Sequence, residues 1–283
     1  MTHEVGRARY YERIITARQL DAFHVTQREV GEFFLTESAF PSGFKLPKHS
    51  HRYHCIYIVL KGGFIETQGS KSRRRKPLDV VLTPFDQPHA DNFDDSGGRC
   101  FIVEIPTRWT ESIRDYTAIF DDSAELSGDS MSWLMMRLYK ESRNLDRFSP
   151  LVTEGILLEI MAMASRCFKE TIQRKPPPWL VIAEGMLREQ LSESLTLSYV
   201  ASSVGVHPVY LASTFRKYHG RSIGERVRRL RIEYACHVLG ASDAPITDIA
   251  LEAGFADHSH LCKTFKKLTG LTPAEYRALM RRS

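Results

Sequence analysis

The pattern of apolar and polar positions divides the chain into a β-rich first part and a helical remainder. Between about residues 30 and 106, three β-branched and aromatic runs are typical of strands: His54–Leu60, Asp79–Thr83 and Cys100–Ile105. The breaks between such runs contain residues typical of turns: Gly62-Gly63, Pro84 and Gly97-Gly98. Several short strands at this spacing predict a β-sandwich or a small barrel.

After Pro106 the apolar spacing becomes that of α-helices. We predict one helix over 130–145, and a second from a single apolar stripe made of Leu157, Ile160, Met161, Ala164 and Phe168. The run Lys175-Pro176-Pro177-Pro178 cannot continue a helix, and we place a domain boundary there. From Trp179 onward the pattern is almost wholly helical.

The predicted fold class is therefore α+β. A β-barrel domain covers 1–107, a helical connector over 108–175 packs against it and offers a possible dimerisation face, and an all-α domain covers 179–283. With 283 residues the chain is long enough for two domains, each with its own core. Its 42% hydrophobic and 26% charged residues are typical of a soluble globular protein.

The all-α region contains an internal repeat, Leu197–Glu225 and Ile246–Glu275. Among the positions that match between the copies are Ala201, Gly205, Leu211 and Phe215 in the first, and Ala250, Gly254, Leu261 and Phe265 in the second. The alanine lets two helices cross closely, and the glycine permits a sharp turn between them. The leucine and phenylalanine, four residues apart, hold the next helix against the first. The repeat therefore predicts two helix-turn-helix units.

Local signals also place the helix starts. Pro208 suits the first turn of one second helix, and Asp257 can cap its counterpart. Capping boxes follow at Ser222–Glu225 and Thr272–Glu275, and the first opens a helix that runs to about Leu239. Roughly 18 residues at ~1.5 Å each give a helix of ~27 Å. Such a helix can hold two recognition helices about one DNA turn, ~34 Å, apart. One side carries Val227, Leu230, Tyr234 and Val238, and the other carries Arg226, Arg228, Arg229 and Arg231.

The outer faces of the two second helices carry the candidate DNA contacts. The predicted base-contacting residues are Val209, Ala212, Ser213, His258, Ser259 and Lys263, and the predicted phosphate contacts are Arg216, Lys217, Lys266 and Lys267. Lys263 and His258 can bond base edges, whereas Val209 and Ala212 can touch thymine methyl groups. Each basic residue taken alone is equally consistent with a solvated helix face.

The segment Gly254–Arg277, GFADHSHLCKTFKKLTGLTPAEYR, closely resembles the signature of the AraC/XylS family of bacterial transcription regulators. The resemblance extends over roughly residues 179–282. It implies two helix-turn-helix units that bind adjacent major grooves and activate or repress a nearby promoter. The first unit departs from the family pattern, because His207 stands where a capping serine is common and Ser213 where a longer polar residue often lies. Base reading by that unit is accordingly expected to be weak.

Hydropathy, cysteine content and net charge indicate the cellular environment in which the protein works. No window of ~18 apolar residues occurs, so no membrane span is expected, and the N-terminal residues lack the apolar core of a signal peptide. The five cysteines are scattered, without a CxxC pair, which indicates free thiols in a reducing cytoplasm. A net charge of +5 is weak evidence for a polyanionic partner.

Three histidines, His49, His51 and His54, lie within six residues ahead of an apolar run. His49 and His51 share one face of a strand because side chains alternate with a period of two. With His89 from a neighbouring strand they would supply three imidazoles, enough for Zn, Fe, Mn or Ni. His54 is out of phase with the other two unless the strand is bulged.

The same histidines resemble two cupin motifs. Gly43, His49-Ser50-His51 and Gly62 resemble the first motif, and Pro84–Asn92, which contains His89, resembles the second. Relatives in the AraC/XylS family often carry such an N-terminal sensor. A glutamate expected near position 55 or 56 is replaced by Cys55 and Ile56. Three interpretations stay open: framework or ligand-pocket histidines, a metal used for sensing or structure, and a catalytic metal.

The resemblance implies a cytoplasmic regulator, not an enzyme, that binds double-stranded promoter DNA. Its N-terminal barrel would sense a small molecule or metal, RNA polymerase would be a partner, and a homodimer is possible. The alternative is a metal-dependent cupin enzyme with an accessory helical domain. A basic run, Lys71–Lys76, is most simply a solvated hairpin loop, with a DNA or polymerase contact as the alternative.

Overall fold

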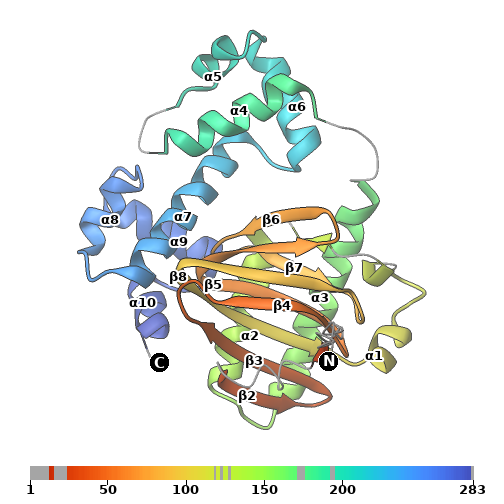
Figure 1. Cartoon of the computed structure of the whole chain (residues 1–283). Helices are drawn as coiled ribbons and strands as arrows, with labels where there is room; N and C mark the ends of the chain where they lie inside the picture. Colours follow the sequence, from red (N-terminus) through yellow and green to blue (C-terminus); the bar gives the residue numbers. More distant parts are fainter. Residues whose placement is uncertain are drawn as a thin grey trace, which may run out of the picture.

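The computed structural model describes residues 13–15, 24–117, 119–121, 124–126, 129–170, 176–191 and 195–281. A mixed β-sheet forms one layer, helices cover one of its faces, and a helical region built from the end of the chain extends away from it (Figure 1). The predicted α+β class is confirmed.

The sheet contains β1 (Arg13–Ile15), β2 (His24–Val30), β3 (Phe33–Phe40), β4 (Lys45–His51), β5 (His54–Gln68), β6 (Lys71–Arg75), β7 (Val80–Thr83), β8 (His89–Ile105) and β9 (Ala124–Glu125). All strand pairs are antiparallel except β1 with β4. The two long strands organise the sheet, because β5 pairs with β6, β7 and β8, while β8 pairs with β3, β4 and β5.

Both long strands bend at glycines that the sequence pattern assigned to turns. Gly62 pairs with Gly98 in the middle of the β5–β8 ladder, and register shifts flank the position. Gly62 and Gly97 have φ angles of +71° and +65°, which glycine adopts without strain. A Cβ on Gly62 would lie 2.0 Å from the Gly97 carbonyl oxygen, so only glycine fits this close backbone approach. The prediction of turns here was wrong because the glycines bend continuous strands.

The apolar run in β5 has both faces buried. Ile56 and Ile58 face the layer of helices, whereas Tyr57 and Val59 face an interior that the bent sheet encloses. A strand covered on both sides reads as a continuous apolar run and does not alternate. The relationship of this bent sheet to the cupin fold stays a prediction.

The basic run at 71–76 forms β6 and its end, so the hairpin-loop prediction was wrong. Arg75 is buried and makes ion pairs with Glu66 and Glu125. Arg74 pairs with Asp94 across the sheet. Strand pairing with β5 brings Arg75 close to Glu66, and this ion pair lowers the cost of burying the Arg75 charge.

The connector region contains α1 (Thr107–Ser112), a short 3₁₀ helix η2 (Ile119–Asp121), α2 (Asp129–Arg143) and α3 (Ser149–Glu170). The helix predicted over 130–145 corresponds to α2. Four residues of the predicted apolar stripe on α3 are buried: Leu157, Ile160, Met161 and Ala164. The side chain of the fifth, Phe168, lies outside the described residues.

The last region contains α4 (Pro178–Glu189), α5 (Leu197–Ser203), α6 (Pro208–His219), α7 (Ile223–Ala241), α8 (Ile246–Glu252), α9 (His258–Thr269) and α10 (Pro273–Arg281). Pro178 occupies the first turn of α4, where its missing N–H costs nothing. Most of the predicted boundary before it lies outside the described residues, and the domain limits stay predictions.

Candidate nucleic-acid interface and buried pocket

The first helix-turn-helix unit consists of α5 and α6. Ala201 is fully buried where the helices cross, and its carbonyl accepts a hydrogen bond from the Val206 N–H at 3.0 Å across the turn. Gly205, in the turn, has a φ of +71°. His207 replaces the usual capping serine and still performs the capping role, because its Nδ1 accepts a hydrogen bond from the Val209 N–H.

The second unit, α8 and α9, repeats this geometry. The Ala250 carbonyl accepts from the Phe255 N–H at 2.8 Å, and Gly254 has a φ of +82°. The Asp257 carboxylate caps α9 by accepting from the His260 N–H at 2.7 Å. The matching turns and caps confirm two equivalent units, as the internal repeat predicts.

The recognition helices α6 and α9 bury the side chains that the sequence places inward. Leu211, Phe215, Leu261 and Phe265 are fully buried. Of the predicted base-contacting residues, Ala212 is half-buried and the others are exposed: Val209, Ser213, His258, Ser259 and Lys263. The predicted phosphate contacts are also exposed: Arg216, Lys217, Lys266 and Lys267. All ten residues are therefore accessible on α6 and α9, and their contact with DNA stays a prediction.

The helix α7 joins the two units and is more deeply buried than one apolar stripe suggests. The predicted capping box is present, with the Ser222 N–H donating to the Glu225 carboxylate at 2.6 Å. Ile232 and Cys236 are fully buried on a side that the predicted stripe did not include. Arg226 is also buried and bonds the Glu184 carboxylate of α4. Its place opposite the apolar stripe therefore does not make it a solvent-facing or DNA-facing residue.

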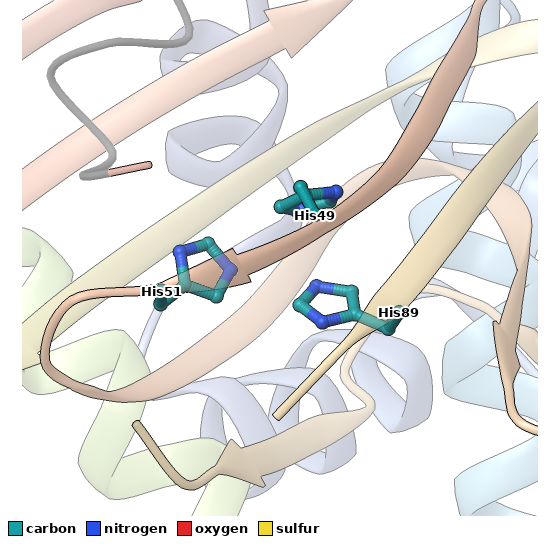
Figure 2. Close-up of side chains that lie close together, drawn as sticks. All are labelled: His49, His51 and His89. Atoms are coloured by element: carbon teal, nitrogen blue, oxygen red, sulfur yellow. The ribbon is translucent and has the colours of Figure 1, made fainter. Parts of the chain in front are cut away.

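A second candidate site lies in the interior of the bent sheet. His49 and His51, two residues apart on β4, and His89, at the start of β8, form a group that we call the histidine cluster (Figure 2). All three are buried, and one ring nitrogen from each lies within 4.8 Å of the others. The ring centroids of His49 and His89 are 4.2 Å apart because the two residues pair across the ladder. As the sequence predicts, the three histidine side chains therefore lie close together.

The cluster opens onto a narrow pocket walled mainly by aromatic side chains, which we call the aromatic pocket: Phe40, Tyr57, Phe64 and Phe93. Asp91 also lines the pocket, and burial raises the pKa of its carboxyl group to about 7. Sequence reasoning missed these residues. The spacing of Asp91 two residues after His89 was the available signal, because it places both side chains on one face of β8.

His54 does not join the cluster. Its ring contacts Phe85 and Phe120, and its Nδ1 accepts a hydrogen bond from the Phe85 N–H. His54 is the first residue of β5, a different strand from the β4 that carries His49 and His51, and it lies in separate apolar surroundings. Burial lowers the pKa of His54 from 6.5 to about 4.

This burial predicts a pH-dependent stability. Because the folded-state pKa of His54 lies below its unfolded value, the unfolded chain binds more protons once the pH falls below about 6.5. Stability is therefore lost as the pH falls from about 6.5 towards 4. We expect His54→Gln to remove about 2 kcal/mol of the loss between pH 7 and pH 5, measured by urea unfolding at both values. The exposed His237, changed to glutamine, should leave the loss unchanged; an equal effect of both substitutions would contradict the prediction.

Comparisons with known proteins agree with the geometry of the two units. Residues 200–279 match the family model of a helix-turn-helix domain, which covers α6–α9 and parts of α5 and α10. The chain is 30% identical over 135 residues to the melibiose operon regulatory protein of Escherichia coli K12, covering 48% of this chain and 44% of that protein. It is 39% identical over 87 residues to the regulatory protein PocR of Salmonella typhimurium, covering 31% of this chain and 29% of that protein.

The C-terminal region is an AraC-type helix-turn-helix domain. The chain is also 28% identical over 153 residues to the transcriptional activator RhaR of Yersinia pseudotuberculosis, covering 53% of each chain. This chain thus spans between 29% and 53% of the length of these three relatives. Among solved structures, the C-terminal domain of AraT from Geobacillus stearothermophilus matches 38% of this chain and 88% of its own, with 29% identity and a TM-score of 0.36. ToxT from Vibrio cholerae matches 89% of this chain and 100% of its own, with 14% identity and a TM-score of 0.41.

The two units of the AraC-type domain belong to different hydrophobic cores. The first unit, α4 and the start of α7 enclose a core of their own, which includes Leu187, Leu211 and Phe215. The second unit shares a core with the sheet, α2 and α3, which includes Phe101 and Phe265. The AraC-type domain therefore does not have a single core of its own, and its second unit packs against the N-terminal domain.

Polar contacts reinforce this shared core. The Tyr276 hydroxyl donates to the Leu60 carbonyl of β5. Arg229 of α7 donates to the Leu78 carbonyl at 2.9 Å and to the Ser132 hydroxyl at 3.1 Å. Lys76, which follows β6, bonds Glu233 of α7. These contacts connect the AraC-type domain directly to the sheet that contains the histidine cluster.

Within the described residues, no helix is long and apolar enough to cross a lipid bilayer.

Proposed function

We propose that this protein is a sequence-specific, DNA-binding transcription regulator. The observation that carries the proposal is the pair of equivalent helix-turn-helix units on one connecting helix, each with an exposed outer face on its second helix. A lone unit of this kind also occurs as a plain helical hairpin. Two units with matching turns, caps and exposed faces form the arrangement needed to enter two successive major grooves.

In the proposed complex, side chains near the N-terminal ends of α6 and α9 read bases. Lys263 and His258 bond base edges from α9, while Val209 contacts thymine methyl groups from α6. Arg216 and Lys266, near the C-terminal ends of these helices, neutralise phosphates. Ser213 is short, so α9 contributes more of the sequence discrimination than α6.

Binding is best measured with the full-length protein, because the second unit shares its core with the sheet. A preferred site selected from random duplexes should bind more tightly than a scrambled duplex of equal length. The affinity should fall steeply with salt, since several phosphate contacts release counterions. Equal and weak affinity for every sequence would contradict sequence-specific regulation.

Lys263→Ala should weaken binding to the selected site by about 1–3 kcal/mol, because this side chain is placed to bond a base edge. The loss should be smaller on a scrambled duplex, and titration by fluorescence anisotropy on both duplexes measures it. Lys45→Ala removes an exposed lysine from the sheet strand β4 and serves as the control. An equal loss on both duplexes would indicate that Lys263 contacts only phosphate.

The N-terminal domain is proposed to gate DNA binding. Support comes from the shared core and from the Tyr276–Leu60 and Arg229–Leu78 contacts, through which a change in the sheet reaches the second unit. The effector is a small molecule or metal bound in the sheet interior. RNA polymerase as a partner, a cytoplasmic location and a homodimer complete the proposal, with α2 and α3 as the candidate dimer face.

The histidine cluster is the observation behind a second candidate function, that of a metal-dependent cupin enzyme with an accessory helical domain. The names of the relatives favour regulation, since they describe operon regulators and a transcriptional activator. Turnover of a small substrate that disappears in His51→Ala would instead support the enzyme.

A further inference from the structure

The histidine cluster has the orientation of a preorganised ligand set. The Nδ1 of His49 lies 2.9 Å from the Pro47 carbonyl oxygen, and the Nδ1 of His89 lies 3.0 Å from the Gln87 carbonyl oxygen. A carbonyl only accepts hydrogen bonds, so both Nδ1 atoms must carry the proton. In a neutral imidazole this leaves the lone pair on Nε2. Each ring is thus held in one tautomer by a main-chain oxygen, as is usual for metal-bound histidines.

The third ring provides an independent observation. The Nδ1 atom of His51 is buried and has no hydrogen-bond partner among the described residues. A buried polar atom without a partner loses its hydration and gains nothing in return, which costs free energy. A ligand held between His51 and the two oriented rings would compensate for that loss. The tilted arrangement of the three rings around a common space is visible in Figure 2.

We propose that His49, His51 and His89 together bind one divalent first-row transition-metal ion. A set of imidazole nitrogens suits Zn²⁺, Ni²⁺, Co²⁺ or Fe²⁺, whereas Mg²⁺ and Ca²⁺ require oxygen ligands. Metal–nitrogen bonds of ~2.1 Å place tetrahedral ligand atoms ~3.4 Å apart. Small side-chain rotations bring nitrogens that already lie within 4.8 Å to that separation. This assignment concerns the N-terminal domain alone and stands whether or not the chain binds DNA.

Three protein ligands leave at least one coordination position for water or another donor. The pocket onto which the cluster opens is lined mainly by apolar and aromatic side chains, and Asp91, two residues after His89, supplies a carboxylate. Asp91 Oδ1 is buried without a hydrogen-bond partner. Its carboxylate compensates part of the metal charge, or accepts a hydrogen bond from a metal-bound water. Because the three histidines line the aromatic pocket, a small organic molecule in that pocket with an oxygen or nitrogen donor would lie next to the proposed metal.

The test uses the full-length protein purified without chelator or affinity tag. Its metal content is measured by mass spectrometry, and chelator-treated protein is then titrated with Co²⁺, whose visible absorption reports coordination geometry. We expect one equivalent of metal, a Co²⁺ spectrum of a four- or five-coordinate site, and a higher Tm with metal. Less than a tenth of an equivalent, without any Co²⁺ spectrum or Tm shift for Zn²⁺, Ni²⁺ or Fe²⁺, would overturn the proposal.

Substitutions assign the ligands. His51→Gln should lower the metal affinity about 100-fold or more, and His49→Gln and His89→Gln should act similarly. His54→Gln is the matched control, because His54 is equally buried on the adjacent strand but faces Phe85. Circular dichroism confirms that each variant folds. Metal bound with unchanged affinity by all three cluster variants would place the ion elsewhere and refute the assignment. Because no DNA is present, failure of the regulator proposal would leave these results unaffected.

Discussion

Arg229→Ala should lower the free energy of unfolding by about 3–5 kcal/mol. The guanidinium is buried between the sheet and the AraC-type domain, where it donates to the Leu78 carbonyl and the Ser132 hydroxyl and pairs with Glu233. Truncation removes the donor to the Ser132 hydroxyl and one of the two donors to the Leu78 carbonyl, and it weakens the compensation of the Glu233 charge. Removal of one partner from a buried pair has this cost. Urea unfolding of full-length protein at pH 7 measures the effect.

The neighbouring Arg228 provides a matched control. It lies on the same helix but is exposed, so Arg228→Ala should change the free energy of unfolding by no more than about 0.5 kcal/mol. Arg229→Lys keeps the charge but loses the planar fork that reaches two acceptors, and should recover only part of the loss. Similar results for Arg228→Ala and Arg229→Ala would mean that the contact between the sheet and α7 contributes little.

Alanine substitutions of two phenylalanines at equivalent positions of the repeat should loosen different parts of the protein. Phe215→Ala and Phe265→Ala each remove a fully buried ring, at a cost of about 3–5 kcal/mol. Phe265 lies in the core shared with the sheet, so its cavity should raise hydrogen exchange in α9, α2 and β5 together. Phe215 lies in the separate core, so its cavity should raise exchange in α4–α6 and leave the sheet protected.

Hydrogen exchange followed by mass spectrometry separates the two patterns. The wild type serves as the reference, and Val209→Ala, at a residue 69% exposed on α6, controls for an apolar truncation that creates no cavity. If Phe215→Ala also raised exchange throughout β5 and β8, the two cores would not be independent. The core that the second unit shares with the sheet would then include the first unit as well.

Much of the helical region follows from local sequence signals, because its structure is locally determined. The alanine and glycine of each turn, the Ser222 box and the Asp257 cap act over a few residues and need no distant partner. The bent sheet is different. Whether Gly62 forms a turn or bends a strand depends on Gly97 and Gly98 across the ladder, some 35 residues away. Single-sequence periodicity carries no information about that pairing.

The same distinction applies to the candidate sites. The exposure of Lys263 and the convergence of His49 and His51 follow from the periods of helix and strand. The burial of Arg226 and Arg229 does not, because an arginine-rich helix face is ordinarily solvated. Only the position of carboxylates and carbonyls on α4 and the sheet reveals that these arginines are internal.

The helix α7 begins in one core and ends in the other, so its length determines how far apart the two helix-turn-helix units lie. Each residue added to an α-helix advances the chain by ~1.5 Å and turns it by ~100°. One inserted residue would therefore swing the first unit a quarter turn or more around the axis of α7, out of alignment with the second. Seven residues, close to two full turns, would restore the alignment but move the units ~10 Å further apart. In the proposed complex, the number of residues in this one helix would therefore set the distance between the two DNA half-sites.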